Sequence, residues 1–255
     1  MKEKPRRRET VVLKIGTRSI VTPDGCIREE LLDRIAEDVF LLQQFDYHTI
    51  IVSSGAIACG KMLTNKLLSK QAYAGIGQPH LMASWEKAFA KVNLLTAQGL
   101  YVNSDLCKKE SCKSATKTLG EYRRAGIVPI LNENDMVTDA EVRDLFGFGD
   151  NDQLASLIAR AQEAKFLFSL TTVDGVICPK KNTVIPLLSS RERVVESSLQ
   201  SWKGDSHGGM TSKVHSAKAF VRSVKGSRAF IASYREEDIL RRVIIERERI
   251  GTEIY

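Results

Sequence analysis

The 255-residue sequence has few of the residues that mark secreted or metal-binding scaffolds. Its five cysteines are scattered, odd in number and without a C-x-x-C pair, which argues against a disulfide framework and a zinc cage. Four histidines and no H-E-x-x-H motif exclude the metalloprotease pattern. No apolar run approaches the roughly 20 residues of a membrane span, and Lys14 interrupts the short run after the basic N-terminus. We therefore expect a cytoplasmic protein with no membrane partner.

The charge is mildly basic, with 38 Lys and Arg against 31 Asp and Glu and a net charge of +7. This diffuse charge suits a polyanionic ligand such as a nucleotide, and we expect no nucleic-acid partner. The one basic cluster, Lys4 to Arg8, falls in residues 1–9, which we interpret as a flexible tail. There is no internal repeat and no Pro/Gly/Ser linker, so we expect residues 10–255 to form a single domain.

Short β-branched runs alternate with segments of helical period. The runs predict strands over Val11–Ile15, Thr49–Ser53, Leu94–Val102, Ile127–Leu131, Lys165–Thr171 and Ser227–Ala232. The periodic segments predict helices over Arg28–Gln44, Lys66–Val92 with a break near Gly75-Ile76-Gly77, Ser111–Ala125, Asp152–Ala161 and Ser212–Val224. This alternation predicts an α/β fold, a three-layer αβα sandwich around a mainly parallel sheet.

Polar groups follow four of the predicted strands. They are Lys14-Ile15-Gly16-Thr17, Ser53-Ser54-Gly55, Asn132-Glu133-Asn134-Asp135 and Thr171-Thr172. Ligands of open α/β sheets bind beyond the carboxyl ends of the strands. Four polar ends in one sheet therefore indicate a crevice for a charged ligand.

Lys14 is unusual because it is a cation inside an apolar strand. It is either an edge-strand lysine that reaches water or a functional cation at the strand end, and Gly16 directly after it favours the second interpretation. Gly55 and Gly60-Lys61 have the spacing of a phosphate-binding P-loop. Met62 stands where that loop needs a Ser or Thr, which argues against it.

Two further segments combine glycine with charge. The segment from Gly208 to Lys213 leads into a predicted helix, and free N–H groups there would cradle a phosphate. Lys213 is a cation near the positive end of the helix dipole, which suggests an anion nearby. The segment Gly149-Asp150-Asn151-Asp152 is either a helix cap or a pair of carboxylates that needs a neutralising partner.

Together these stretches resemble the amino acid kinase family. The matching segments, in family order, are Val12 to Thr17, Ile51 to Ala58, Gln71 to Gln78, Val128 to Asp135, Gly149 to Asp152 and Gly208 to Lys213. Asn-Glu-Asn-Asp combined with Gly-Asp-Asn-Asp is the most specific feature. It is typical of members that phosphorylate glutamate rather than aspartate, acetylglutamate, carbamate or uridylate.

The resemblance implies a carbamate kinase-like fold and ATP-dependent phosphorylation of the side-chain carboxylate of L-glutamate. The product would be L-glutamyl 5-phosphate, the first intermediate of proline biosynthesis. The N-terminal part would bind glutamate, and the part from about residue 150 would bind the nucleotide. Mg²⁺ would accompany ATP, with no side chain assigned to the metal. The resemblance also implies a homo-oligomer, dimer or tetramer, and functional coupling to glutamyl phosphate reductase.

The resemblance assigns roles to particular residues. Lys14 and Lys213 would be the catalytic cations, and Asp152 would orient both. Glutamate would be bound by Ser54, Gly55, Asp135 and Asn151. ATP would be bound by Lys14, Gly16, Thr171, Thr172, His207, Gly208, Gly209, Met210, Thr211, Ser212 and Lys213. These charges suit the chemistry, since an ionised carboxylate needs no general base but its approach to a phosphate needs cations.

Three departures from the family pattern accompany the match. Thr171-Thr172 stands where members have Thr/Ser-Asp, and Ser206-His207-Gly208 stands where they have Gly-Thr-Gly. Many members also carry a C-terminal PUA domain, which we expect this chain to lack. The alternatives are a relative acting on another small carboxylate or carbamate, and a non-catalytic amino-acid or nucleotide sensor.

Overall fold

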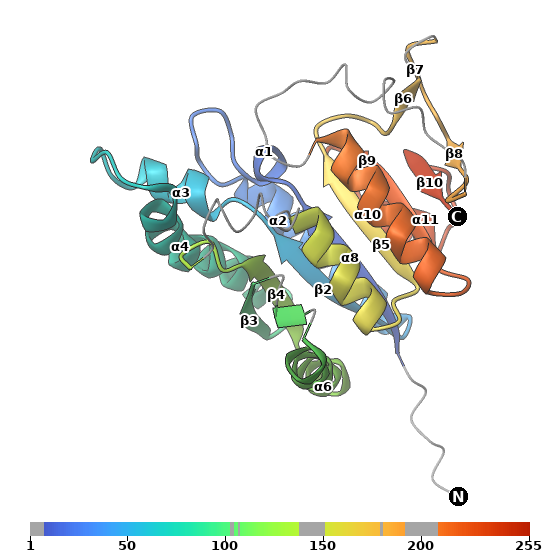
Figure 1. The fold of residues 1–255 in the computed structure, drawn as a ribbon, viewed down its shortest axis with the longest axis horizontal. Coiled ribbons are helices and arrows are strands. Elements are labelled where there is room, and N and C mark those ends of the chain that lie inside the picture. Colours follow the sequence, from blue (N-terminus) through green and yellow to red (C-terminus); the bar gives the residue numbers. More distant parts are fainter. Residues whose placement is uncertain (1–7, 103–104, 107, 138–150, 179–180, 192–208) are drawn as a thin grey trace, which may run out of the picture.

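The structure is a computed structural model that describes residues 8–102, 105–106, 108–137, 151–178, 181–191 and 209–255 (Figure 1). Its strands are β1 (Glu9–Ile15), β2 (Tyr47–Ser53), β3 (Thr96–Tyr101), β4 (Val128–Glu133), β5 (Phe166–Thr171), β6 (Ile177–Cys178), β7 (Thr183–Val184), β8 (Leu187–Leu188), β9 (Arg228–Ser233) and β10 (Thr252–Ile254). Its helices are α1 (Thr17–Ile20), α2 (Glu29–Gln44), α3 (Ala56–Met62), α4 (Lys70–Ala90), α6 (Lys109–Ala125), α8 (Asn151–Ala161), α10 (Met210–Ser223) and α11 (Ile239–Ile244).

Eight strands form one sheet in the order β3-β4-β2-β1-β5-β9-β10-β8, and β6 and β7 form a separate hairpin. The six strands from β3 to β9 in that order all run parallel. The short strand β10 pairs antiparallel with β9. The expected mainly parallel sheet is therefore confirmed, with an antiparallel step near one edge.

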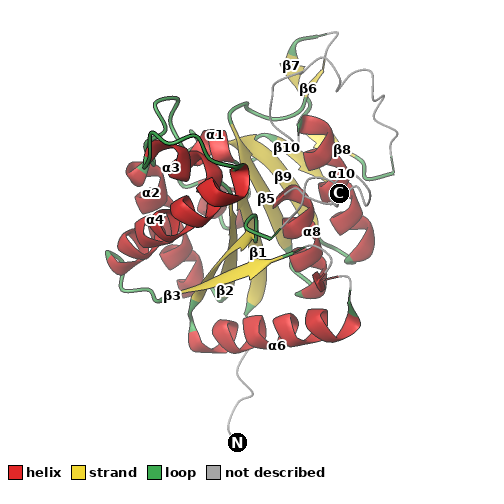
Figure 2. Cartoon of the chain, turned by 60° about the vertical axis from the view of Figure 1, so that its left-hand side comes forward, coloured by secondary structure: helices red, strands yellow, loops and turns green. Residues whose placement is uncertain are grey.

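Alternation along β1 divides the buried side chains between two cores. Val11, Leu13 and Ile15 belong to the core on the face covered by α2, α4 and α11. Val12 belongs to the core on the other face, under α6, α8 and α10. Figure 2 shows α2 and α4 on one side of the sheet and α8 and α10 on the other, and the three-layer sandwich is confirmed. Of the helices described, none has the length and apolar character needed to span a bilayer.

Helix α4 runs without interruption through Gly75-Ile76-Gly77, so the expected break there is wrong. The glycines serve close packing instead. A Cβ on Gly77 would lie 1.9 Å from the carbonyl oxygen of Ala56, and one on Gly60 would lie 1.8 Å from that of Tyr73. Helices α3 and α4 can therefore touch backbone to backbone only with glycine at these contacts.

The same packing removes the P-loop interpretation. The stretch between Gly55 and Lys61 is not a phosphate-binding loop, because Ala56 to Met62 is the helix α3. Gly60 packs against α4 rather than facing a ligand.

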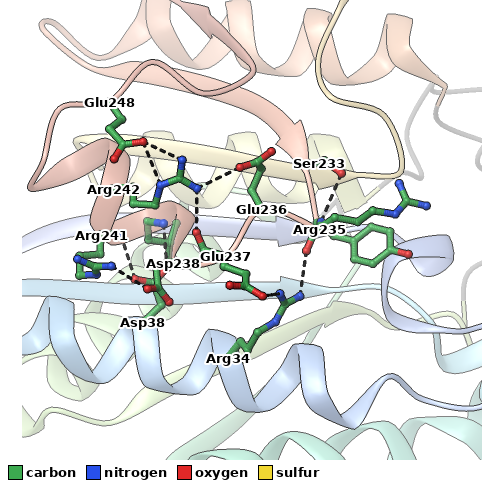
Figure 3. A network of polar contacts seen from close by, with 12 residues as sticks. Arg34, Asp38, Ser233, Arg235, Glu236, Glu237, Asp238, Arg241, Arg242 and Glu248 are labelled. Atoms are coloured by element: carbon green, nitrogen blue, oxygen red, sulfur yellow. Dashed lines mark hydrogen bonds and ion pairs between the residues drawn. The ribbon is translucent and has the colours of Figure 1, made fainter.

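The segment after β9 is fixed to α2 by a polar network (Figure 3). The buried carboxylate of Asp38 accepts hydrogen bonds from the backbone N–H groups of Leu240 at 2.8 Å and Arg241 at 3.0 Å, where α11 begins. Burial raises the pKa of Asp38 to about 6, although these two hydrogen bonds act in the opposite direction. Arg34 adds a contact to Glu237 at 3.4 Å.

Candidate active site

The carboxyl ends of the central strands meet at one edge of the sheet. Ile15, the last residue of β1, pairs with Ser53 of β2 and Leu170 of β5. The turns that follow are tied to their neighbours, since Ser54 N–H donates to the Ile15 carbonyl at 3.1 Å and Gly16 N–H donates to the Leu170 carbonyl at 3.4 Å. The polar segments expected at the strand ends therefore lie along a common edge.

Three charged side chains from three elements converge at this edge. Lys14 Nζ of β1 lies 2.6 Å from Asp152 Oδ1 of α8, and Lys213 Nζ of α10 lies 2.8 Å from Asp152 Oδ2. Their exposures are only 3%, 1% and 9% for Lys14, Asp152 and Lys213. Because β1 lies between β2 and β5, Lys14 is not an edge-strand lysine that reaches water.

The two lysines decide the ionisation of Asp152. Burial alone raises the pKa of this carboxyl group, but the charges and hydrogen bonds of Lys14 and Lys213 outweigh burial and lower it overall. Asp152 is therefore ionised at neutral pH, and the cluster carries one net positive charge. It also supplies the anion that the position of Lys213 in the first turn of α10 required.

The N-terminus of α10 lies beside this cluster, since Lys213 stands in its first turn. Gly209 is its N-cap, and no described atom lies within 4 Å of the place where a Cβ would stand. Met210, Thr211 and Ser212 are half-buried in the first turn. A Cβ on Gly16 would lie 3.9 Å from Lys14 Nζ, so this glycine stands directly beside the ammonium group. Such a helix end with two cations is suited to phosphate.

Next to the charged cluster is a chain of amides. Asn151 Nδ2 donates to Ser54 Oγ at 2.8 Å and to Asn132 Oδ1 at 2.9 Å. Asn132 Oδ1 also accepts from the backbone N–H of Glu133 at 2.9 Å, and Asn132 Nδ2 donates to Gln78 Oε1 at 2.8 Å. The structure thus brings Asn151 and Ser54 together, one residue from Asp152.

Asp135 lies beyond the amide chain. It lines a hollow of about 350 Å³ between α4, β3 and the end of β4, which Gln78 and Asn134 also line. Gly55 is the N-cap of α3 with φ 120°, a backbone conformation that favours glycine, and a Cβ there would lie 3.3 Å from Val21 Cγ2. Gln78 connects this hollow to the amide chain, because it lines the hollow and also accepts the hydrogen bond from Asn132.

The remaining residues expected to bind ATP do not all lie beside the charged cluster. Thr171 ends β5 and is half-buried. Thr172 lines a different cavity of about 590 Å³ together with Thr17 and Arg18, and its carbonyl accepts a hydrogen bond from Arg235 Nη1 at 2.9 Å. His207 and Gly208 lie outside the described residues, as do Gly149 and Asp150.

Comparison with known proteins agrees with this fold. A sequence model of the amino acid kinase family matches residues 9–233. The chain belongs to the amino acid kinase family.

Relatives within the family are named glutamate 5-kinase. The one from Pelobacter propionicus is 32% identical over 97% of this chain, and the one from Citrifermentans bemidjiense is 34% identical over 98% of it. This chain spans 68% and 69% of the lengths of those two proteins. The fold resembles that of Giardia carbamate kinase, with a TM-score of 0.67, 14% identity and coverage of 98% of this chain and 99% of the other.

Side-chain metal ligands are not evident in the described part of this amino acid kinase. Those residues contain no group of three or more His, Cys, Asp or Glu side chains that could hold a metal ion. Both oxygens of Asp152 face lysines.

Two site residues have no assigned role in the sequence-based interpretation. Asn132 and Gln78 both lie in segments that match the family, but neutral amides give no charge pattern that marks them for function. Their importance comes from contacts between residues 54 positions apart along the chain, which only the folded structure brings together.

Proposed function

We propose that this amino acid kinase transfers the γ-phosphoryl group of ATP to the side-chain carboxylate of L-glutamate, giving L-glutamyl 5-phosphate and ADP. The observation that carries the proposal is the buried Lys14–Asp152–Lys213 cluster at the carboxyl edge of the sheet. The similarity to glutamate 5-kinases over 97% or more of the chain supports glutamate as the substrate. The reaction would begin proline biosynthesis.

In this mechanism a carboxylate oxygen of glutamate forms a bond to the γ-phosphorus while the bond from that phosphorus to the β,γ-bridging oxygen breaks. ADP takes the electron pair of the broken bond. The nucleophile is already ionised at neutral pH, so no side chain has to remove a proton. The barrier is the approach of two anions and the negative charge on the transferring group.

Lys14 and Lys213 lower that barrier. Asp152 holds both ammonium groups and spaces them, so they need little reorganisation when the phosphoryl group arrives. Because the cluster keeps one net positive charge in a site shielded from water, its attraction for the transferring group is stronger than it would be at the surface. Asp152 thus has a positioning role, whereas the lysines contact the reacting atoms.

The nucleotide would bind at the first turn of α10. The N–H groups of residues 210–212 and the positive end of the helix dipole would face its phosphate groups. Mg²⁺ would enter with ATP and offset part of the phosphate charge when bound. Gly16, Thr171 and Thr172 are further candidates from the family pattern, together with His207 and Gly208.

Glutamate would bind between Ser54 and Asp135. Asp135 supplies a carboxylate for the substrate ammonium group, and Ser54, Gly55 and Asn151 supply the polar wall toward the two lysines. In this arrangement the substrate would extend its side-chain carboxylate toward Lys14.

The direct test measures ADP release with ATP, Mg²⁺ and a panel of substrates. L-glutamate should support turnover, whereas D-glutamate, aspartate, N-acetylglutamate and carbamate should not. Turnover with carbamate or N-acetylglutamate instead would assign a different member of the family. ATP binding without turnover of any substrate would favour a sensor.

Two variants test the residue roles. Lys213→Ala should lower kcat at least about a hundredfold with a small change in glutamate KM. Lys87→Ala is the matched control, because Lys87 also forms an ion pair at 2.6 Å, with Glu29, but on the exposed surface. Asp135→Ala should chiefly raise the glutamate KM. Normal turnover in Lys213→Ala would remove that residue from the mechanism.

We further propose that the protein acts in the cytoplasm as a homo-oligomer and that residues 10–255 form one domain. An acyl phosphate with a free amino group on the same molecule tends to cyclise, which supports coupling to the reductase that consumes it. Light scattering should give two or four copies, and unfolding should be one cooperative transition. A monomer would contradict the assembly, and two separated transitions would contradict the single domain.

A further inference from the structure

We propose that Gln78 is a positioning residue that acts through Asn132 to fix the amide orientation of Asn151, so that Asn151 presents its oxygen to the amino group of the substrate. This rests on the proposed function, because it concerns how the same site holds an amino acid.

Two contacts, one at each end, hold the Asn132 amide in one orientation. Its Oδ1 accepts from the N–H of Glu133 at 2.9 Å, and a backbone N–H can only donate. The Nδ2 group of Asn132 must therefore point the opposite way, where Gln78 Oε1 accepts from it at 2.8 Å. Asn132 is 2% exposed, so solvent offers it little alternative.

The same orientation is passed to Asn151. Because Asn132 presents an oxygen, Asn151 must present its nitrogen, and Nδ2 donates to Asn132 Oδ1 at 2.9 Å and to Ser54 Oγ at 2.8 Å. Both hydrogens of that amino group are then used. Asn151 Oδ1 is left as an acceptor, and it is buried without a hydrogen-bond partner among the described residues.

A buried acceptor without a partner is costly, and a ligand that donates a hydrogen bond removes that cost. An ammonium group has three donors. Gln78 also lines the hollow that contains Asp135, so the amide chain joins this hollow to the residue beside the Lys14–Asp152–Lys213 cluster. Asn151 Oδ1 and the Asp135 carboxylate would then share the donors of one ammonium group.

The role of Gln78 is thus to supply a hydrogen-bond acceptor to Asn132, and not merely to fill space. Without an acceptor at position 78, the buried amino group of Asn132 loses this partner, and the amide is held only at its oxygen end and gains by shifting toward another acceptor. Asn151 would then no longer hold its oxygen in place. The loss should appear in the binding of the amino acid and not in the binding of ATP.

The experiment compares three variants of the full chain. Gln78→Met has a similar volume but no acceptor, and Gln78→Glu keeps the acceptor. Gln43→Met is the matched control, since Gln43 Nε2 donates to the Gly126 carbonyl at 3.2 Å, which is another amide hydrogen bond, made at the end of α2. Steady-state kinetics give KM for glutamate, KM for ATP and kcat, and thermal unfolding reports stability.

We expect Gln78→Met to raise the glutamate KM roughly tenfold and to leave the ATP KM within about twofold of the wild type. Gln78→Glu should recover most of the glutamate affinity, and Gln43→Met should behave as the wild type. An unchanged glutamate KM in Gln78→Met would overturn the proposal. So would equal losses in Gln78→Met and Gln78→Glu, or a parallel rise of both KM values.

A second measurement does not depend on activity. The side-chain amide hydrogens of Asn132 and Asn151 should exchange slowly with solvent in the ligand-free wild type, as seen by NMR, and much faster in Gln78→Met. Equal exchange in the two proteins would contradict the positioning role. A wild type that shows this protection but no glutamate-dependent ADP release would refute the proposed function alone.

Discussion

Replacing Asp152 by Asn would test how much the ion pairs of the buried Lys14–Asp152–Lys213 cluster contribute to the stability of the fold. The change removes one negative charge between two ammonium groups at 2.6 and 2.8 Å, in a place where Asp152 is 1% exposed. A pair of unit charges about 4 Å apart attracts by about 4 kcal/mol at an effective dielectric constant of 20. Two such attractions are opposed by repulsion between the lysines and by the cost of burying all three groups.

The net cost of breaking a buried pair in this way is about 3–5 kcal/mol, because both cations lose the carboxylate that they share and remain buried. For a domain of this size that corresponds to a fall in Tm of roughly 6–20 °C. The matched control is Asp33→Asn, which breaks the Asp33–Lys91 pair. That pair has the same 2.6 Å distance, but its side chains are 27% and 52% exposed, so the cost should stay below about 1 kcal/mol.

The effect should also depend on pH in a defined direction. The native pKa of Asp152 lies below its ordinary value of 3.8, so its stabilising contribution is present above pH 3.8 and is lost as pH falls through the native pKa. Urea unfolding at pH 7 should therefore show the full difference between wild type and Asp152→Asn, and the difference should shrink below about pH 4. Equal costs for Asp152→Asn and Asp33→Asn at pH 7 would refute the reasoning.

Three other predictions concern stability. The pKa of Asp38 is raised from 3.8 to about 6, so its contribution to the free energy of unfolding is greatest below pH 3.8 and declines by about 3 kcal/mol as pH rises through 6. Urea unfolding of Asp38→Asn should lack this decline, and a pH profile like that of the wild type would contradict the prediction. Gly77→Ala should destabilise the folded protein by more than about 3 kcal/mol or prevent folding, because its Cβ would lie 1.9 Å from the Ala56 carbonyl oxygen. A nearly unchanged Tm in thermal unfolding would disprove the packing argument. Gly120→Ala should instead stabilise by about 0.5–1 kcal/mol in the same assay, since it lies inside α6 and its Cβ would meet only Arg124 Nη1 at 3.7 Å; a loss of stability would count against this.

The main sheet and its edge could be predicted because their signals are local. Strands of β-branched residues separated by amphipathic helices predict parallel pairing, and polar residues directly after the strands indicate a crevice at their carboxyl ends. Lys14 was identifiable from a cation placed within an apolar strand. Asp152 and Lys213 were identifiable from the family pattern, and in the structure Asp152 contacts both Lys14 and Lys213.

Other features depend on contacts that no local pattern reveals. The segment Gly75-Ile76-Gly77 has the glycines that are typical of a helix break. Helix α4 nevertheless continues through it, because α3 packs against Gly77. Short elements such as α1 and β10 contain too few residues for a periodic signal, and tertiary contacts stabilise them. Asp38 has the sequence context of an ordinary helix surface, but α11 makes it a buried cap.

The measurement that tests the central claim most directly uses L-glutamate labelled with ¹⁸O in its side-chain carboxylate. If that carboxylate attacks the γ-phosphorus, cyclisation of L-glutamyl 5-phosphate breaks the bond from carbon to oxygen and releases phosphate. We predict one ¹⁸O atom in each released phosphate for the wild type, and almost no phosphate from Lys213→Ala. Unlabelled phosphate released at the rate of ADP formation would mean that water is the acceptor, and would contradict the account.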